Sequence, residues 1–151
     1  MSTTRIHQRF TLQAVERLKL RKQIETLFQT GEAFSVFPLR VVYQYLPERG
    51  EAEPSPVRIG FSIPKKRLRK AVQRNRVRRL LKEAWRLQKH ALYAQVPATA
   101  QLHCFFIYTG NDQFTFPDAE KVVKKVMGRL LRIVNPAPES GQGETAAGAN
   151  A

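Results

Sequence analysis

The sequence predicts an α+β protein, an α-β sandwich whose elements follow the order αββαβα. Three observations support this prediction. The chain has 151 residues, 42% of them hydrophobic, which is enough for one domain with a sizeable core. Apolar residues at helical spacing alternate along the chain with stretches rich in β-branched and aromatic residues. One predicted helix is enclosed by two predicted strands, and such a unit packs its helix against a sheet.

The first half of the chain contains one predicted helix and two predicted strands. The helix covers residues 19–31, where apolar side chains recur at helical spacing. The first strand covers residues 34–46, and Pro38 places its beginning at an edge of the sheet, because proline has no N–H for the ladder. The second strand covers residues 57–63, with alternate apolar side chains on one face.

The second half contains a basic helix over residues 70–86, a strand over 102–110 and a helix over 116–134. The strand is almost entirely apolar, which is typical of a strand buried on both faces. The last helix carries one apolar stripe. We expect helices to cover one face of the sheet. If the opposite face is open and carries aromatic side chains, single-stranded nucleic acid could stack there.

The ordered domain is predicted to span residues 19–135. Residues 1–18 are polar and mixed in charge, and we expect them to be loosely ordered. Residues 136–151 are small, polar and proline-containing. This composition buries too little surface to offset the entropy of ordering, so a disordered tail is expected there.

Positive charge is concentrated in one segment of the chain. The formal net charge is +14 at pH 7, and eleven of the 22 residues from 65 to 86 are Lys or Arg, against one acid, Glu83. Such a concentration produces a local positive field that attracts a polyanion. A helix face that serves only solubility usually intersperses acids among its basic residues, and this segment does not.

The basic segment predicts a helix with two different sides. Val77, Leu80, Leu81 and Ala84 fall on one side and form a core stripe. The opposite side presents Arg and Lys around Asn75, and the planar fork of Arg matches phosphate oxygens. Among polyanions RNA is favoured. A membrane helix would need the apolar stripe for lipid, a zipper protein would need heptads downstream, and a helix-turn-helix would need a second short helix nearby.

The protein offers little for catalysis or metal binding of its own. Cys104 is the single cysteine, and the three histidines share no ligand spacing with it or with one another. We expect Asp112, Asp118 and Glu120 to act as helix caps, and Trp85 and Cys104 to lie in the core. No stretch approaches the ~20 apolar residues of a membrane span, so we expect no membrane association and a cytoplasmic location.

The stretch GFSIPKKRLRKAVQRNRVRRLLKEAWR, residues 60–86, resembles the signature of the bacterial ribonuclease P protein component. That signature is a strand ending in Lys-Lys, a short connection, Ala-Val, and then Arg-Asn-Arg on a basic helix. The stretch RLKLRKQIETLFQTG, residues 17–31, resembles the first helix of the family, and the similarity covers residues 17–134. The resemblance implies a fold like that of a ribosomal small-subunit protein domain, with a left-handed crossover around the basic helix.

The resemblance also implies a function. In this family a partner ribonuclease P RNA binds most of the Mg²⁺ and cleaves the 5′ leader from precursor tRNA. One protein docks on each RNA and grips the leader, so neither catalytic groups nor a metal site are expected in the protein. A structural RNA-binding protein, such as a ribosomal or assembly factor, is the alternative that charge and fold alone leave open.

Finally, the resemblance assigns candidate site residues. Phe28 matches an aromatic residue of the first helix beside the leader cleft, and Tyr43 and Tyr45 are candidates for the same cleft. Ile24 stands where the family often has Phe, and its helical spacing with Phe28 leaves a core role open for Phe28. The resemblance assigns to RNA binding Lys65, Lys66, Arg74, Asn75, Arg76, Arg78, Arg79 and Lys82, and the charge of the basic segment itself adds Arg69, Lys70 and Arg86.

Overall fold

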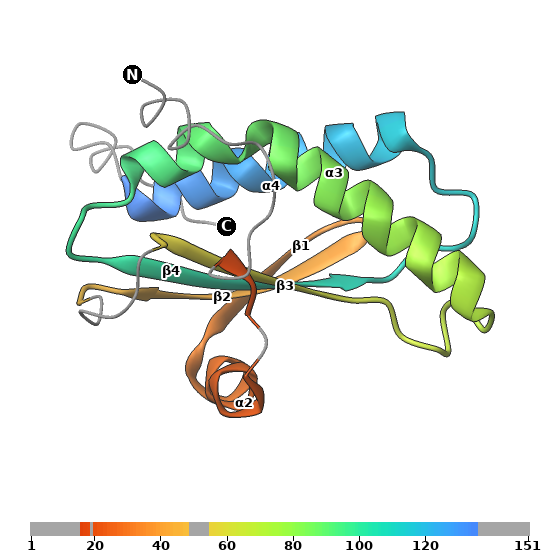
Figure 1. Cartoon of the computed structure of the whole chain (residues 1–151), viewed down its shortest axis with the longest axis horizontal. Helices are drawn as coiled ribbons and strands as arrows, with labels where there is room; N and C mark the ends of the chain where they lie inside the picture. The colour runs from red at the N-terminus through yellow and green to blue at the C-terminus, as the bar shows by residue number, and fades with distance from the viewer. Residues whose placement is uncertain (1–15, 19, 49–54, 136–151) are drawn as a thin grey trace, which may run out of the picture.

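The computed structural model describes residues 16–18, 20–48 and 55–135. These residues form a four-stranded sheet with helices packed on it, which confirms the predicted α+β class (Figure 1). The helices are α2 (Arg21–Thr30), α3 (Ala71–Gln95) and α4 (Phe116–Val134). The strands are β1 (Glu32–Val36), β2 (Leu39–Leu46), β3 (Val57–Ser62) and β4 (Gln101–Tyr108).

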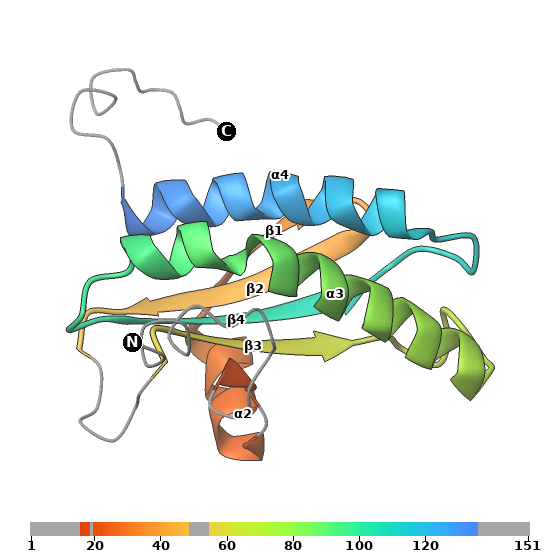
Figure 2. The same cartoon turned by 45° about the horizontal axis from the view of Figure 1, so that its top comes forward.

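The strands of the sheet follow the order β1-β2-β4-β3. β2 is antiparallel to both β1 and β4, whereas β3 and β4 are parallel and are connected through α3. In Figure 2, β3 and β4 both run from left to right with β4 above β3, and α3 returns in front of them. The crossover is therefore left-handed, as the family resemblance implies and against the general preference for right-handed connections.

The structure corrects the first predicted strand, residues 34–46, which is in fact two strands. Val36 pairs with Leu39, and Phe37 and Pro38 make the turn of a β1–β2 hairpin. Proline cannot donate to a strand ladder, and the chain reverses at this position instead of continuing straight. The element order is therefore αβββαβα, one strand more than predicted and within the same fold class.

The main core lies between the sheet and the two long helices. α3 and α4 lie side by side on one face of the sheet, and α2 lies on the other (Figure 1). α4 has the predicted bounds, whereas α3 continues beyond its predicted end at residue 86. The largest fully buried side chains of this core are Trp85, Tyr108, Phe106, Leu39, Ile59, Leu81, Leu92, Leu102 and Leu130.

The second face of the sheet is partly covered rather than open. Leu27 of α2 is buried with Val42 of β2 and Leu18 in a small second core. Half-buried Phe105 and Ile107 of β4 border this cluster. α2 thus covers only part of this face, and Phe105 and Ile107 stay partly exposed at its border.

A short N-terminal segment continues the sheet at its β3 edge. Arg17 forms an isolated bridge with Ile59, and the Leu18 N–H donates to the Ile59 carbonyl at 2.9 Å. Residues 16–18 therefore pack with the domain, although the prediction places the start of the ordered domain at residue 19. The predictions for residues 1–15 and for the 136–151 tail lie outside the described residues.

A buried ion pair attaches this segment to α3. Glu16 is 5% exposed and Lys89 is 2% exposed. Glu16 Oε1 accepts hydrogen bonds from Lys89 Nζ at 2.7 Å and from the Tyr93 hydroxyl at 2.8 Å. Burial raises the pKa of Tyr93 well above its ordinary value, and the charge of Glu16 raises it further. The Tyr93 hydroxyl therefore stays protonated and donates a hydrogen bond to the Glu16 carboxylate.

Removal of the Lys89 charge should destabilise the fold. Lys89→Met leaves the Glu16 carboxylate buried without its cation, so we expect the free energy of unfolding to fall by about 3–5 kcal/mol. The double variant Glu16→Gln/Lys89→Met removes both charges and should recover most of that loss. Urea denaturation followed by circular dichroism measures both.

The control is the exposed pair Arg21–Glu25, at 3.3 Å on α2. Glu25→Gln should change the free energy of unfolding by only about 0–1 kcal/mol. Equal losses in the single and double variants at Glu16 and Lys89 would show that charge pairing does not hold the segment.

Candidate nucleic-acid interface

α3 separates an apolar side from a basic side, as the spacing of its residues predicts. Val77, Leu81 and Ala84 are at most 1% exposed and belong to the main core. Because this stripe recurs with the helical period, the residues between its members face away from the sheet. Asn75, Arg76 and Arg79 are exposed, and Arg74, Arg78, Lys82 and Arg86 are half-buried.

The connection between β3 and α3 carries the remaining predicted basic residues. Leu68 is buried and anchors it, and the N–H groups of Arg67 and Leu68 donate to the Pro64 carbonyl at 3.0 and 3.2 Å. Arg74 Nη1 donates to the carbonyls of Leu68 at 2.9 Å and Arg69 at 2.7 Å. The connection is thus held in a fixed form. The basic side chains that it exposes are Lys65, Lys66, Arg67, Arg69 and Lys70.

Two of these basic residues differ from the sequence-based assignment. Arg74 is predicted to bind RNA, but in the structure its guanidinium points back to the connection and fastens it. Arg74 therefore acts first by fixing the connection and the basic side chains that it carries. Arg67 is absent from the predicted residues although it is exposed on the same turn. The run of basic residues from 65 to 70 is the sequence signal that indicates Arg67 as a further RNA-binding candidate.

Polar pairs order the basic side of α3. Asn75 Oδ1 accepts from Arg78 Nη1 at 3.0 Å, which holds the Arg78 guanidinium on the outer face. Arg86 Nε donates to Glu83 Oε1 at 3.1 Å, and the two side chains form an ion pair. This hydrogen bond lowers the pKa of Glu83 and raises the pKa of Arg86. An RNA phosphate that reaches Arg86 would therefore have to replace a carboxylate.

Three cations converge on a small pocket beside α3. Arg17, Arg78 and Lys82 line a cavity of about 210 Å³, and no acidic side chain is among its lining residues. Burial lowers the pKa of Lys82, and the charges of Arg17 and Arg78 lower it further. Because these like charges disfavour one another, a bound anion such as phosphate would stabilise the arrangement.

Arg17 is the other contributor that the sequence-based assignment misses. It lies in the stretch predicted to be loosely ordered, and its place beside α3 depends on the neighbouring Glu16–Lys89 pair. That pair joins residues far apart in the chain, so no local pattern indicates it.

Phe28 is exposed on α2 and is not a core residue. Its side chain is 48% exposed, and its ring meets the Phe105 ring edge-on at a centroid distance of 5.4 Å. Gly60 of β3 lies opposite Phe105, and a Cβ at Gly60 would come within 2.5 Å of that ring. Glycine at this position therefore makes room for Phe105 and for the aromatic pair.

Tyr43 and Tyr45 do not lie on the same face of the sheet as Phe28. Side chains alternate along a strand, and Val42, between them and the turn, packs with α2. Tyr43 and Tyr45 pack instead against the core beneath α3 and α4. The Tyr43 hydroxyl donates to Glu32 Oε1 at 3.1 Å. The structure therefore corrects the expectation that these three aromatic residues share one cleft.

Trp85 and Cys104 lie in the core, as the sequence predicts. Trp85 is fully buried and its Nε1–H donates to the Tyr93 hydroxyl at 3.2 Å. Cys104 is fully buried, which raises the pKa of its thiol. Within residues 16–18, 20–48 and 55–135, no group of three or more His, Cys, Asp or Glu side chains is placed to hold a metal ion. No helix in this part of the chain is long and apolar enough to span a bilayer.

Together, the fold and this surface define a small basic α-β sandwich protein whose longest helix presents a face suited to a polyanion. The family model described as Ribonuclease P matches residues 12–131. The chain is 41% identical over 132 residues to the ribonuclease P protein component of Porphyromonas gingivalis, covering 87% of this chain and 92% of that protein. The chain therefore belongs to the ribonuclease P protein component family, whose members take part in ribonuclease P activity with an RNA partner.

More distant relatives and solved structures agree with this assignment. The Chlorobaculum tepidum ribonuclease P protein component is 27% identical over 130 residues, covering 82% of this chain and 84% of that protein. The RNase P protein of Staphylococcus aureus superposes with a TM-score of 0.59 at 17% identity, over 76% of this chain and 94% of that chain. The protein from Thermotoga maritima gives a TM-score of 0.58 at 19% identity, over 76% and 96%. At these identities, the two solved structures show that the fold is shared.

Arg74→Ala and Arg79→Ala should have different consequences. Arg74→Ala removes charged donors to two carbonyls and should lower the free energy of unfolding by about 1.5–3 kcal/mol, along with RNA affinity. Arg79 is exposed, so Arg79→Ala should lower affinity alone and reduce the log–log salt slope of RNA binding by roughly 0.7–0.9. Urea denaturation and filter binding across a salt series measure the two effects. Unchanged stability of the Arg74 variant would contradict its assigned role.

Proposed function

We propose that this protein holds ribonuclease P RNA and precursor tRNA together while the 5′ leader is removed. The observation that carries the proposal is the continuous basic surface formed by α3 and the connection before it. Residues 65–86 contain eleven Lys and Arg residues and a single acid, and all eleven basic residues are exposed or half-buried. Such a surface matches the phosphate backbone of RNA.

The docking surface is expected to have a fixed centre and an adjustable rim. Asn75 and Arg78 are already paired, so their geometry is set before RNA binds. Arg17, Arg78 and Lys82 supply a site for one phosphate at the flank of the helix. The side chains on the connection add further phosphate contacts, and one protein would dock on each RNA.

In this proposal the chemistry belongs to the RNA. Mg²⁺ ions, held mainly by the RNA, would supply the charge that hydrolysis of the phosphodiester needs, and the protein would raise the affinity for substrate. We expect the complex to act in the cytoplasm.

The leader is proposed to lie beside α2, where Phe28 and Phe105 form an aromatic pair. Phe28 is 48% exposed, and a partly exposed aromatic ring can stack on an unpaired base of any sequence. The half-buried side chains of β4 continue this surface. Tyr43 and Tyr45 lie on the opposite face of the sheet, so they are not assigned to the leader.

Reconstitution tests the proposed function. The full-length chain is mixed with a bacterial ribonuclease P RNA and 5′-labelled precursor tRNA at a Mg²⁺ concentration too low for the RNA alone. We expect 5′-matured tRNA only when both protein and RNA are present. Binding to the RNA without any gain in cleavage would favour a purely structural RNA-binding role, and cleavage by the protein without RNA would contradict the assignment of catalysis to the RNA.

Phe28→Ala should weaken binding of precursor tRNA but not of mature tRNA by the reconstituted complex. Loss of one aromatic–base stack corresponds to about 1–3 kcal/mol. Phe28→Tyr keeps the ring and should retain the discrimination. Fluorescence titrations with the two tRNAs give the ratio of affinities, after circular dichroism has shown that each variant is folded.

Tyr45→Ala is the matched control, because it removes a half-buried aromatic ring from the opposite face of the sheet. It should leave the ratio unchanged. If the folded Phe28→Ala protein discriminates precursor from mature tRNA as well as the parent does, Phe28 has no part in leader binding.

A further inference from the structure

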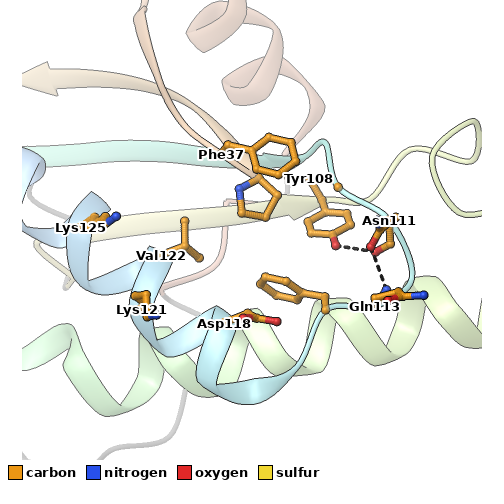
Figure 3. Close-up of a pocket in the computed structure, with 11 residues that line it drawn as sticks. Phe37, Tyr108, Asn111, Gln113, Asp118, Lys121, Val122 and Lys125 are labelled. Atoms are coloured by element: carbon orange, nitrogen blue, oxygen red, sulfur yellow. Dashed lines mark hydrogen bonds between the residues drawn. The ribbon is translucent and has the colours of Figure 1, made fainter.

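A second pocket lies where the β1–β2 turn meets the loop after β4 and the first turns of α4 (Figure 3). Its volume is about 310 Å³, near the lower limit for small-ligand sites, which suits one nucleotide. Phe37, Tyr108 and Phe114 form its aromatic lining. The ring centroids of Tyr108 and Phe114 are 5.1 Å apart. Neither the basic side of α3 nor the aromatic pair beside α2 belongs to it.

The loop that forms one wall of this pocket is held in place by its own hydrogen bonds. The Tyr108 hydroxyl donates to the Asn111 carbonyl, and Asn111 Oδ1 accepts from the Gln113 N–H at 2.9 Å (Figure 3). Burial raises the pKa of Tyr108 to about 12, so the hydroxyl keeps its proton at neutral pH. A Cβ at Gly110 would come within 2.6 Å of the Tyr108 hydroxyl oxygen. The wall is therefore preorganised, which lowers the entropic cost of binding.

The opposite wall is the beginning of α4, which is also fixed. Thr115 and Asp118 form a capping box, in which Asp118 Oδ2 accepts from the Thr115 N–H at 3.0 Å and from its hydroxyl at 2.9 Å. Lys121 and Lys125 follow on this helix, one turn apart, and both line the pocket (Figure 3). A pair of ammonium groups beside aromatic rings offers a phosphate contact next to a stacking surface.

Phe37 gives the pocket an exposed aromatic rim. Its side chain is 78% exposed, more than that of any other large hydrophobic residue among the described exposed ones. A phenyl ring at a hairpin turn with this exposure contributes little to the core. Exposed aromatic rings beside basic residues are the elements with which proteins bind unstacked bases.

We propose that this pocket binds a single unstacked nucleotide of an RNA, with its base against Phe37 and its phosphate between Lys121 and Lys125. The proposal rests on the proposed function in one respect, because it takes the ligand to be RNA. Gln73 Nε2 on the first turn of α3 donates to Asp112 Oδ2 at 3.3 Å, which joins the pocket loop to the start of the basic helix. An RNA docked at the start of α3 would lie near this loop.

An acidic peptide with an aromatic side chain has similar chemistry and is the competing occupant. RNA is favoured because the chain has a net charge of +14 and the loop of this pocket is hydrogen-bonded to the first turn of the basic helix. It is also favoured because one pocket offers two ammonium groups for a phosphate and aromatic rings for a base.

Nuclear magnetic resonance titration of the full-length protein with adenosine 5′-monophosphate tests this assignment. We expect saturating shifts at the amides of Gly110 and Phe114, and weaker shifts there with ribose 5-phosphate, which lacks the base. Equal shifts with ribose 5-phosphate, or no saturating shift at these amides, would overturn the proposal. Shifts at the α3 amides report the separate basic surface, so failure here is distinguishable from failure of RNA docking.

Variants at Phe37 sharpen the test, since this exposed residue can be replaced without loss of core packing. Phe37→Leu should raise the dissociation constant about 5- to 150-fold, the range for one lost base stack. Phe37→Trp keeps a stacking ring and should retain binding, and Leu87→Ala, which removes an exposed apolar side chain on α3, should change nothing. Equal affinity of the Leu and Trp variants would overturn the stacking role. Tighter binding of a short Glu-Trp-Glu peptide than of the nucleotide would overturn the assignment to RNA.

Discussion

Burial of one apolar stripe of α3 against the sheet is the interaction on which the rest of the structure depends. Val77, Leu81, Ala84 and Trp85 are at most 1% exposed. Each large apolar side chain buried in this way contributes about 1.5–3 kcal/mol, whereas a pair of like charges one turn apart costs only a few tenths of a kcal/mol. Packing therefore sets the rotation of the helix, and its Arg and Lys side chains between residues 74 and 86 collect on the outer side, whereas Lys89 is buried in its pair with Glu16. The protein presents this charged surface before any partner arrives.

One local and one long-range attachment extend that surface beyond the helix. Arg74 fastens the connection after β3 and keeps its basic side chains beside the start of α3. The buried Glu16–Lys89 pair fastens the N-terminal segment along the same helix, where Arg17 meets Arg78 and Lys82. The aromatic side chains exposed beside α2 lie on the opposite face of the sheet from both long helices. The architecture thus separates the surface proposed for ribonuclease P RNA from the surface proposed for the leader.

The sequence predicts the features that depend on local periodicity. The two sides of α3 follow from the spacing of its apolar residues, and α4 has its predicted bounds for the same reason. Pro38 indicates an interruption of the strand, but the sequence alone does not distinguish a strand at the edge of the sheet from a hairpin turn. The alternation of Tyr43 with Val42 shows that they lie on opposite faces, and only the packing of α2 decides which face Phe28 shares. Glu16 and Lys89 are 73 residues apart, and the pocket joins the β1–β2 turn to residues 108–125. Both depend on tertiary contacts that no local pattern indicates.

Lysine acylation of the protein, alone and bound to ribonuclease P RNA, followed by mass spectrometry, tests the central claim most directly. Each lysine then reports whether RNA covers it. The account predicts strong protection of Lys65, Lys66, Lys70 and Lys82, with little change at Lys22, which is exposed on α2. Protection of Lys22 equal to that of the lysines on α3 and its preceding connection, or no protection of the latter, would contradict the claim that the outer side of α3 is the surface on which the RNA docks.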